Sequence, residues 1–480
     1  MNADELEIWM QRASAWGAEY RRTLESRPVR PSVQPGEISQ QIADSPPVKA
    51  ESMETIFSDF ERIIPDGMTH WQHPRFFAYF QSNSAPATVV AEILATALGS
   101  QCMLWQTSPA ATELEVKMVD WLRKASGLPE EYKGVLQDTG STATLCAILT
   151  MREIATKFTS NQEGLFNKSQ LRVYASERTH SSIDKAMWIS GLGQENLVKI
   201  PTDENFAMRA DVLQQAIVDD RSKGFTPAGI VICVGATSIG ATDNVREICT
   251  IAQDENLYTH VDAAWAGSAM ICPEFRDMWD GIELADSIVW NPHKWLGATM
   301  ECSAHFIKDP VVLVKTLAIQ PAYLETQGKD GIINFSEWGI QLGRRFRALK
   351  LWFLLRAYGL EGIQERIRNH IKWANDLAER LQGEEDFEIV TAPILSLFSF
   401  RYIPASSKNI NDKNARESRL AEINSNLLEA LNDDGTVYLT QTTHEGAFVI
   451  RFVTGQFDMQ EKEIDIAFEV ITRLARSLDV

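Results

Sequence analysis

The sequence predicts an α/β protein with a mostly parallel sheet and helices on both faces. Between about residues 130 and 310, apolar runs of strand length alternate with amphipathic runs of helix length. Repeated strand–helix–strand units form parallel sheets, because each crossover needs a helix that then covers one face of the sheet. In such sheets, ligands bind beyond the carboxyl ends of the strands.

The individual elements follow from this alternation. Strands are expected at 171–175, 197–200, 229–234, 257–261, 287–290 and 304–307, and helices at 142–157, 211–220 and 244–254, the last with Asp243 as its N-cap. A helix is expected at 349–360. It leads into a smaller α+β region near the C-terminus, with strands at 394–401 and 447–452 and helices at 371–381 and 461–478. A first helix, 5–25, carries Trp9 and Trp16 on an apolar stripe, which can pack on the same chain or on a second subunit.

The composition excludes several classes of partner. The chain has 480 residues, is 44% hydrophobic and carries a net charge of −19, which argues against nucleic acid or an anionic membrane as a main partner. It has no uninterrupted apolar run of about 18 residues, and its first residues are acidic, so neither a spanning helix nor a secretory signal is expected. Six scattered cysteines indicate reduced thiols in a cytoplasmic protein, and the eight histidines lack metal-ligand spacing, so no metal is expected.

An aspartate and a lysine each follow one of the expected strands. Asp262 follows the run Leu257–Val261, and Lys294 follows the run Ser287–Trp290. A lysine amine can bind the aldehyde of pyridoxal phosphate covalently, and a carboxylate can hold a proton on the pyridine nitrogen, so that the ring accepts electrons. The pair therefore predicts a pyridoxal-phosphate enzyme.

Three further places in the sequence carry groups suited to the same cofactor. Thr139, Gly140 and Ser141 open a helix, where free N–H groups and hydroxyls can hold a phosphate or simply cap the helix. His180 follows the strand at 171–175 and can stack on a flat cofactor and transfer protons, or be a loop residue. His293 can serve the phosphate or pack; the other six histidines are interpreted as structural.

A long polar loop, one cluster of arginines and the single Arg451 complete the candidates. The loop 318–335 has the character of a lid, in which Tyr323 either anchors the loop or supplies a proton to the substrate carbon. The cluster Gly343–Arg347 is interpreted mostly as a solvated helix start. Arg451 interrupts an apolar strand and needs an anion, either a neighbouring carboxylate or that of a substrate.

With these residues assembled, nearly the whole chain resembles the group II pyridoxal-phosphate-dependent decarboxylases, and among them the aromatic-L-amino-acid decarboxylases. The markers are His70–Pro74 with Phe76–Phe80, Ser108–Ala110 with Glu113–Glu115, His260–Ala264, Asn291–Trp295 and Leu342–Arg347. The resemblance implies the aspartate-aminotransferase type of fold (fold type I) and an obligate homodimer whose active sites lie at the subunit interface. It also implies three parts: a dimer-wrapping helical segment at 1–84, a large cofactor-binding domain at 85–364 and a small α+β domain at 365–480.

The resemblance also assigns roles to individual positions. Lys294 matches the lysine that binds the cofactor, Asp262 the partner of the pyridine nitrogen, His180 the stacked histidine and Tyr323 the lid tyrosine that returns a proton to Cα. Ala264 matches the residue on the other side of the ring, Thr237 a threonine near cofactor and substrate, and Gly140, Ser141, Asn291 and His293 positions around the phosphate. The expected substrate contacts are Tyr79, Phe80, Gln81, Gln101, Met103, Gly343 and Arg451.

The implied reaction is decarboxylation of an aromatic amino acid, such as tyrosine, dihydroxyphenylalanine, tryptophan or phenylalanine, to the amine and carbon dioxide. Gln81 stands where aromatic decarboxylases usually have proline, and Gln101 and Met103 where an aliphatic and an aromatic side chain line the pocket from the partner subunit. Two glutamines favour a more polar substrate, such as 2,4-diaminobutyrate, histidine or glutamate. An aromatic aldehyde synthase is the second alternative, although such relatives commonly carry phenylalanine in place of Tyr323 or alter the histidine matching His180. The intact Lys294, Asp262, His180 and Tyr323 argue against a non-catalytic relative.

Overall fold

The computed structural model describes residues 1–319 and 332–478, and its contacts divide the chain into two compact units. The first, here called the sheet unit, comprises residues 82–372 and 393–397. The second, here called the terminal unit, comprises residues 1–81, 373–392 and 398–480. The division of the chain into three parts at residues 84 and 364 stays a prediction.

A seven-stranded, mostly parallel sheet forms the centre of the sheet unit, as the sequence predicts. Its strands are β1 (Lys133–Gln137), β2 (Leu171–Ser176), β3 (Leu197–Ile200), β4 (Thr226–Cys233), β5 (Tyr258–Asp262), β6 (Ser287–Trp290) and β7 (Ser303–Ile307), in the order β1-β7-β6-β5-β4-β2-β3. The pairs β2–β3, β2–β4, β4–β5 and β5–β6 are parallel, whereas β7 runs antiparallel to both β1 and β6. The carboxyl ends of β4, β5 and β6 therefore lie side by side.

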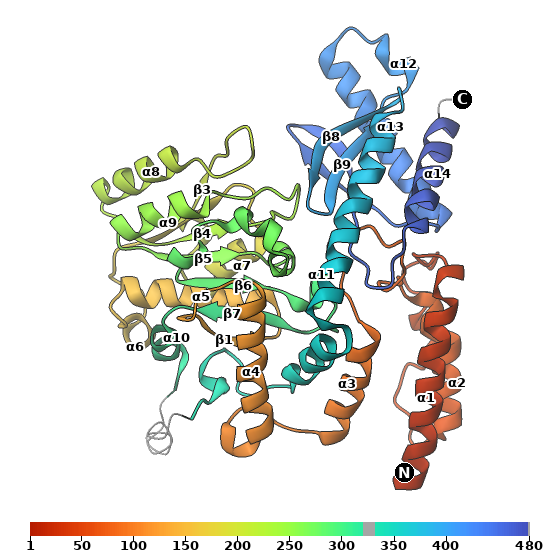
Figure 1. Cartoon of the computed structure of the whole chain (residues 1–480), viewed down its shortest axis with the longest axis horizontal. Helices are drawn as coiled ribbons and strands as arrows, with labels where there is room; N and C mark the ends of the chain where they lie inside the picture. The colour runs from red at the N-terminus through yellow and green to blue at the C-terminus, as the bar shows by residue number, and fades with distance from the viewer. Residues whose placement is uncertain (320–331, 479–480) are drawn as a thin grey trace. The chain divides into compact units, whose positions relative to one another are not determined.

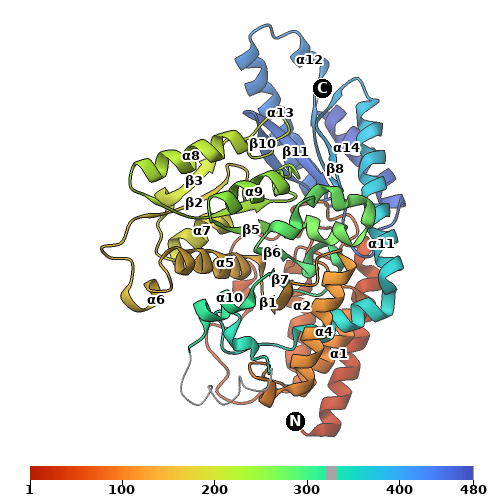
Figure 2. The same ribbon diagram turned by 60° about the vertical axis from the view of Figure 1, so that its left-hand side comes forward.

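Helices cover the sheet in two separate groups (Figures 1 and 2). One group contains α5 (Gly140–Ala155), α7 (Ser181–Ile189) and α10 (Pro310–Leu317), and the other α8 (Ala210–Ser222) and α9 (Val245–Asp254). The helix α5 lies so close to β4 that a Cβ added at Gly229 would be 2.5 Å from the Met151 sulfur. The remaining helices of the unit are α3 (Pro86–Leu98), α4 (Pro109–Ala125), the single turn α6 (Ser160–Glu163) and the first part of α11 (Arg347–Gln382).

The terminal unit contains a four-stranded sheet and helices from both ends of the chain. The strands β8 (Phe387–Ile394), β9 (Leu397–Tyr402), β10 (Thr440–His444) and β11 (Ala447–Val453) are ordered β10-β11-β9-β8. The helices are α1 (Ala3–Thr23), α2 (Met53–Ile63), α12 (Ala405–Lys408), α13 (Lys413–Asp434), α14 (Lys462–Ser477) and the last part of α11. Trp9 and Trp16 pack on Phe57 and Phe60 of α2, at ring-centroid distances of 5.7 and 4.8 Å. Part of the apolar stripe of α1 is therefore covered by its own chain.

Three local predictions were wrong. The N-cap of α9 is Asn244, whose side chain accepts the N–H of Glu247, because the Asp243 carboxylate bonds to other backbone groups. The expected strand 394–401 begins too early, because Ile394 ends β8, the chain turns at Leu395, which has a φ of 53°, and β9 starts at Leu397. The expected helices 349–360 and 371–381 are both helical and lie within α11, but the break between the two helices is at Gly359, so the second helix begins before residue 371. Within the described residues, no helix is long and apolar enough to cross a membrane.

Candidate cofactor site

Asp262 lies at the carboxyl end of β5, between β4 and β6. It is the last residue of its strand and stands opposite Cys233 of β4 and Val289 of β6. Its side chain is buried, and its Oδ1 accepts the N–H of Ala264 at 3.0 Å. The carboxylate is thus fixed at the edge of the sheet where parallel sheets bind their ligands.

Lys294 follows the neighbouring strand β6, in a short turn, Pro292–Leu296, that departs from helical geometry at Lys294 itself. Its carbonyl oxygen accepts the side-chain amide of Asn83 at 2.8 Å, which fixes the backbone. Burial lowers the pKa of the Lys294 amine, while the Asp262 carboxylate and Cys233 raise it. A lowered pKa leaves more of the amine neutral, and the neutral amine is the form that attacks a carbonyl.

His180 is the N-cap of α7. Its Nδ1 accepts the backbone N–H of Ser182 at 3.1 Å, so the neutral ring carries its proton on Nε2. The surrounding protein atoms lower the pKa of His180, the Asp262 carboxylate opposes this effect, and the Lys294 amine adds to it. The structure therefore brings His180, Asp262 and Lys294 within electrostatic reach of one another.

The first turn of α5 is open to an anion. Thr139 occupies the N-cap position, yet its side chain makes no capping hydrogen bond. A Cβ at Gly140 would lie 3.0 Å from Nδ2 of Asn291, so Asn291 lies directly beside this turn. The Asn291 side chain is held in place because its Oδ1 accepts the Ser303 hydroxyl at 2.6 Å. Ordinary side-chain capping is thus absent at this helix end, and the N–H groups of the first turn fit a phosphate.

Three further predicted cofactor contacts lie on the segments that follow β4, β5 and β6. The carbonyl of Ala264 accepts the N–H of Asn291 at 2.9 Å, which joins the segments after β5 and β6. Thr237 lies in the loop that follows β4. His293 is buried, its Nδ1 accepts the N–H of Cys302 at 3.0 Å, and burial lowers its pKa to about 3, so the ring is neutral. A contact between His293 and a cofactor phosphate stays a prediction.

The predicted substrate contacts fall in both units. In the sheet unit, Gln101 is exposed, and its Oε1 accepts the N–H of Arg344 at 2.7 Å. A Cβ at Gly343 would lie 3.1 Å from the Gln101 Nε2, so these two residues are neighbours. Met103 is half-buried, and its carbonyl accepts the N–H of Ser336 at 3.0 Å.

The other substrate candidates, Tyr79, Phe80, Gln81 and Arg451, belong to the terminal unit. Gln81 is buried and its amide donates to the carbonyls of Phe76 and Val453, at 3.2 and 2.7 Å, so its donors are used within the unit. The buried Arg451 guanidinium lies 5.6 Å from the Phe80 ring centroid and donates to the Thr440 hydroxyl at 3.2 Å; burial lowers its pKa to about 10. Tyr79 is exposed. Tyr323 lies outside the described residues.

The interpretation of the Gly343–Arg347 cluster as solvated was wrong for two of its arginines. Arg344 is buried against Glu115, and Arg347 is buried against Glu301, whereas Arg345 is exposed. Sequence reasoning did not assign a role to Glu115, although it stands in the marker Glu113–Glu115 on the buried face of α4. A carboxylate on the apolar face of an amphipathic helix was the available signal.

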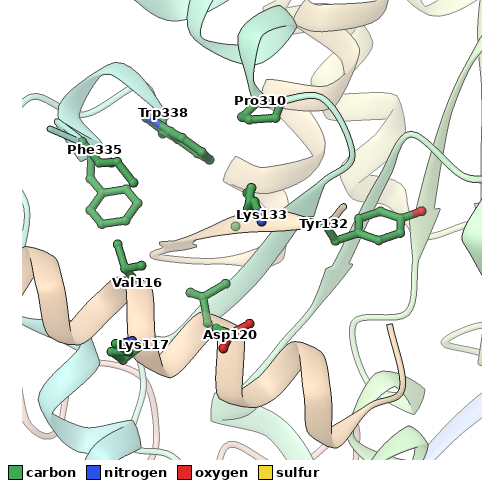
Figure 3. A pocket seen from close by; sticks show the side chains of 11 residues that line it. Val116, Lys117, Asp120, Tyr132, Lys133, Pro310, Phe335 and Trp338 are labelled. Atoms are coloured by element: carbon green, nitrogen blue, oxygen red, sulfur yellow. The ribbon is translucent and has the colours of Figure 1, made fainter. Parts of the chain in front are cut away.

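A separate cavity of about 410 Å³ lies between α4, β1 and the segment Ile333–Trp338. Figure 3 shows Phe335 and Trp338 at one end of it and Tyr132 at the other. Among the described residues that line it, none is a cofactor or substrate candidate. Within the described residues, no cluster of His, Cys, Asp or Glu could hold a metal ion.

Comparison with known proteins yields one consistent relationship. The family model for the pyridoxal-dependent decarboxylase conserved domain matches residues 35–403. The chain is 36% identical to tryptophan decarboxylase 2 of Oryza sativa, over 98% of this chain and 94% of that protein, and 39% identical to phenylacetaldehyde synthase of Petunia hybrida, over 95% and 91%. The crystal structure of Oryza sativa TDC with PLP and tryptamine matches with a TM-score of 0.95 and 32% identity, over 100% of this chain and 99% of that one.

Proposed function

Because the chain belongs to the pyridoxal-dependent decarboxylase family, we propose that it converts an aromatic L-amino acid into its amine and carbon dioxide. One observation carries this proposal: the desolvated Lys294 amine lies within electrostatic reach of the buried Asp262 carboxylate, at the ends of adjacent parallel strands. A relative named for tryptophan decarboxylation covers nearly the whole chain, and a structure that binds tryptamine has the same fold. These likenesses support the aromatic substrate class.

Different residues of the chain bind the cofactor and carry out the steps of the reaction. Pyridoxal phosphate supplies the ring that accepts the electrons of the breaking Cα–carboxylate bond. Lys294 binds the cofactor covalently, Asp262 holds a proton at its pyridine nitrogen, and the first turn of α5, from Gly140, binds its phosphate. His180 and Ala264 contact the ring. Exclusion of water by the surrounding protein favours loss of the carboxylate charge as carbon dioxide, after which the Tyr323 hydroxyl returns a proton to Cα.

Two alternatives rest on specific observations. The aldehyde synthase of Petunia hybrida is about as similar to this chain as tryptophan decarboxylase 2 is, so overall identity does not separate the two reactions. Retention of both His180 and Tyr323 favours decarboxylation. A more polar substrate is supported by the exposed amide of Gln101 beside Gly343, whereas Gln81 has already used its amide donors.

The active form is proposed to be a homodimer in the cytoplasm. The helix α3 exposes an apolar stripe, Val90, Leu94 and Leu98, which are 51, 45 and 66% exposed, at the spacing of one helix face. A second copy of the chain is the proposed cover of this stripe, with α1 packing on the partner. All six cysteines are buried and unpaired, which supports a reducing compartment.

The test is a product balance on the holoenzyme. The protein is incubated with each proteinogenic amino acid, dihydroxyphenylalanine, 5-hydroxytryptophan and 2,4-diaminobutyrate, and carbon dioxide, amine, ammonia and peroxide are all quantified. The proposal expects equal amounts of amine and carbon dioxide from an aromatic substrate. Peroxide and ammonia equal to the carbon dioxide would indicate the aldehyde synthase instead, and turnover of 2,4-diaminobutyrate alone would indicate the polar class.

A variant separates the cofactor assignment from the substrate. Lys294→Ala is expected to lose the visible absorbance of bound pyridoxal phosphate that borohydride removes, and to lose turnover with it. Retention of a borohydride-reducible band in this variant would contradict the assignment of Lys294.

A further inference from the structure

Asp243 is a buried carboxylate outside the set of residues assigned above. It is 3% exposed and follows the loop after β4. Its Oδ2 accepts the N–H of Cys233 and its Oδ1 that of Met208, both at 2.7 Å, and its own N–H donates to the Cys233 carbonyl at 2.9 Å. One side chain thus joins the carboxyl end of β4 to the segment 202–208.

The bond to Cys233 leads directly to the proposed cofactor site. Cys233 stands opposite Asp262 in the β4–β5 pairing, and the next N–H along β4, that of Val234, donates to the Asp262 carbonyl at 2.9 Å. The loop between Cys233 and Asp243 carries Thr237 and closes on itself, because the N–H of Gly235 donates to the Ala241 carbonyl at 3.0 Å. Asp243 therefore fixes both ends of the Thr237 loop beside Asp262.

The hydrogen bond to Met208 connects Asp243 with segment 202–208, which lies near His180. Within segment 202–208, the Thr202 hydroxyl donates to Glu177 at 3.0 Å, and the Phe206 ring lies 5.6 Å from the Arg178 guanidinium. Phe206 also packs against a small apolar cluster that includes Cys233 and residues of the Thr237 loop. Glu177 and Arg178 lie three and two residues before His180, so segment 202–208 contacts side chains of the short connection that leads from β2 to the histidine.

The charge state of Asp243 decides whether both bonds can form. Burial raises its pKa to about 6, the two backbone donors oppose this effect, and Asp203 in segment 202–208 adds to it. The titratable groups that face it are Asp203 and the Cys233 thiol on β4; beyond Cys233 lie Asp262 and Lys294. The ionised carboxylate accepts both N–H groups, whereas a protonated carboxyl places an O–H where one acceptor was.

We propose that Asp243 is a positioning residue for the reaction, which holds the Thr237 loop and the segment beside His180 in place through its two backbone hydrogen bonds. The proposal rests on the proposed function, because it concerns the same site. Asp243 acts through its hydrogen bonds to the N–H groups of Cys233 and Met208. Its removal is expected to displace groups at the site rather than to remove one.

A matched control lies at the amino end of the same sheet, near the start of β5. Asp286 is a second buried carboxylate that holds backbone: its Oδ2 accepts the N–H and the hydroxyl of Thr259, at 2.8 and 3.0 Å. Burial also raises its pKa. Asp243→Asn and Asp286→Asn therefore make the same chemical change on one sheet, at the carboxyl and the amino end respectively.

Three quantities are measured on the wild-type holoenzyme and both variants: bound pyridoxal phosphate, kcat from pH 5 to 9, and amide hydrogen exchange of peptides that cover 202–209 and 233–243. Asp243→Asn is expected to lower kcat at pH 8 by roughly tenfold to a hundredfold, as for a small misplacement of catalytic groups. It is also expected to lose the acid-side fall in kcat near pH 6 and to exchange faster in both peptides. Asp286→Asn is expected to keep the wild-type kcat, pH profile and exchange of these peptides.

Wild-type kcat, pH profile and exchange in Asp243→Asn would overturn the proposal, and so would equal effects from both variants. If Asp243→Asn does not fold, amide hydrogen exchange of the wild type tests the proposal. Peptides 202–209 and 233–243 must then lose protection from exchange, relative to a peptide on β1, as the pH falls through about 6. If the wild type decarboxylates no amino acid, the proposed function fails, while the exchange measurements still test the positioning of the two segments.

Discussion

Arg344 donates through Nη2 to Oε1 of Glu115 at 2.7 Å, and neither side chain is more than 4% exposed. Both residues also hold the end of β1, because Glu115 accepts the N–H of Leu136 and Arg344 donates to the Leu136 carbonyl, each at 2.9 Å. Asp138, two residues later, begins the segment that leads into the first turn of α5. The ion pair thus fixes the strand from which the proposed phosphate site starts.

Breaking this pair is expected to destabilise the protein strongly. Glu115→Ala leaves the Arg344 guanidinium buried without its anion, and such a change lowers the free energy of unfolding by about 3–5 kcal/mol. Affinity for pyridoxal phosphate is expected to fall as well, because the phosphate segment loses its support. Urea unfolding and a cofactor titration measure the two effects. The control is Glu422→Ala, which breaks the exposed pair of Glu422 with Arg419 and is expected to cost less than about 1 kcal/mol; equal costs would contradict the prediction.

The sequence predicted the strands and the residues at their ends better than it predicted side-chain partners. Asp262 and Lys294 could be placed because apolar runs of strand length precede them and parallel strands end at one edge. The partner of Arg344 could not, since Glu115 is 229 positions away and only the packed fold brings the two together. Asp243 shows the same limit. Its position before a helix predicted that its carboxylate would cap that helix, but in the structure the carboxylate accepts the N–H of Met208, which is distant in the sequence. The substrate candidates fall in two different units, and this division depends on long-range contacts that the spacing of apolar residues along the chain does not predict.

Gly140→Ala is expected to weaken cofactor binding. The added Cβ would lie 3.0 and 3.2 Å from the side-chain nitrogen and oxygen of Asn291, so Asn291 or the first turn of α5 has to shift. A rise of roughly tenfold in the dissociation constant, about 1.4 kcal/mol, is expected in equilibrium dialysis. Gly362→Ala in α11 is the control, because a Cβ there meets nothing within 4 Å. It should leave cofactor affinity unchanged and stabilise the helix by about 0.5–1 kcal/mol.

His305→Phe is expected to reduce the loss of stability in acid. His305 is fully buried on β7, where burial lowers its pKa to about 3, whereas in the unfolded chain it titrates near its ordinary value of 6.5. Between these values only the unfolded chain takes up the proton, so lowering the pH through this window favours unfolding by about 1.4 kcal/mol per pH unit. Urea midpoints at pH 8 and pH 5 should therefore differ less in the variant than in the wild type. An unchanged difference would show that His305 does not contribute.

Leu94→Glu is expected to separate the proposed dimer. The substitution places a charge in the middle of the exposed apolar stripe of α3, where a partner would have to bury it. Sedimentation should then give the mass of one 53.9 kDa chain instead of twice that mass. Val218→Glu on α8, at a side chain that is 50% exposed, is the control and should sediment like the wild type. A wild type that sediments as a monomer at micromolar concentration would exclude the dimer.

His180 has a capping role in the structure and a catalytic role in the proposal, and two variants separate them. His180→Asn retains a good N-cap acceptor for the Ser182 N–H, so the free energy of unfolding is expected to stay within about 0.5 kcal/mol of the wild type. Because the imidazole that the proposal places against the cofactor ring is lost, kcat should fall by roughly tenfold to a hundredfold, as for a small misplacement of the reacting groups. His180→Ala should show the same loss of kcat and a further cost of about 1 kcal/mol in stability, since the cap is lost as well. Thermal unfolding and steady-state kinetics at saturating cofactor measure both effects, and a His180→Asn variant with wild-type kcat would leave His180 with the capping role alone.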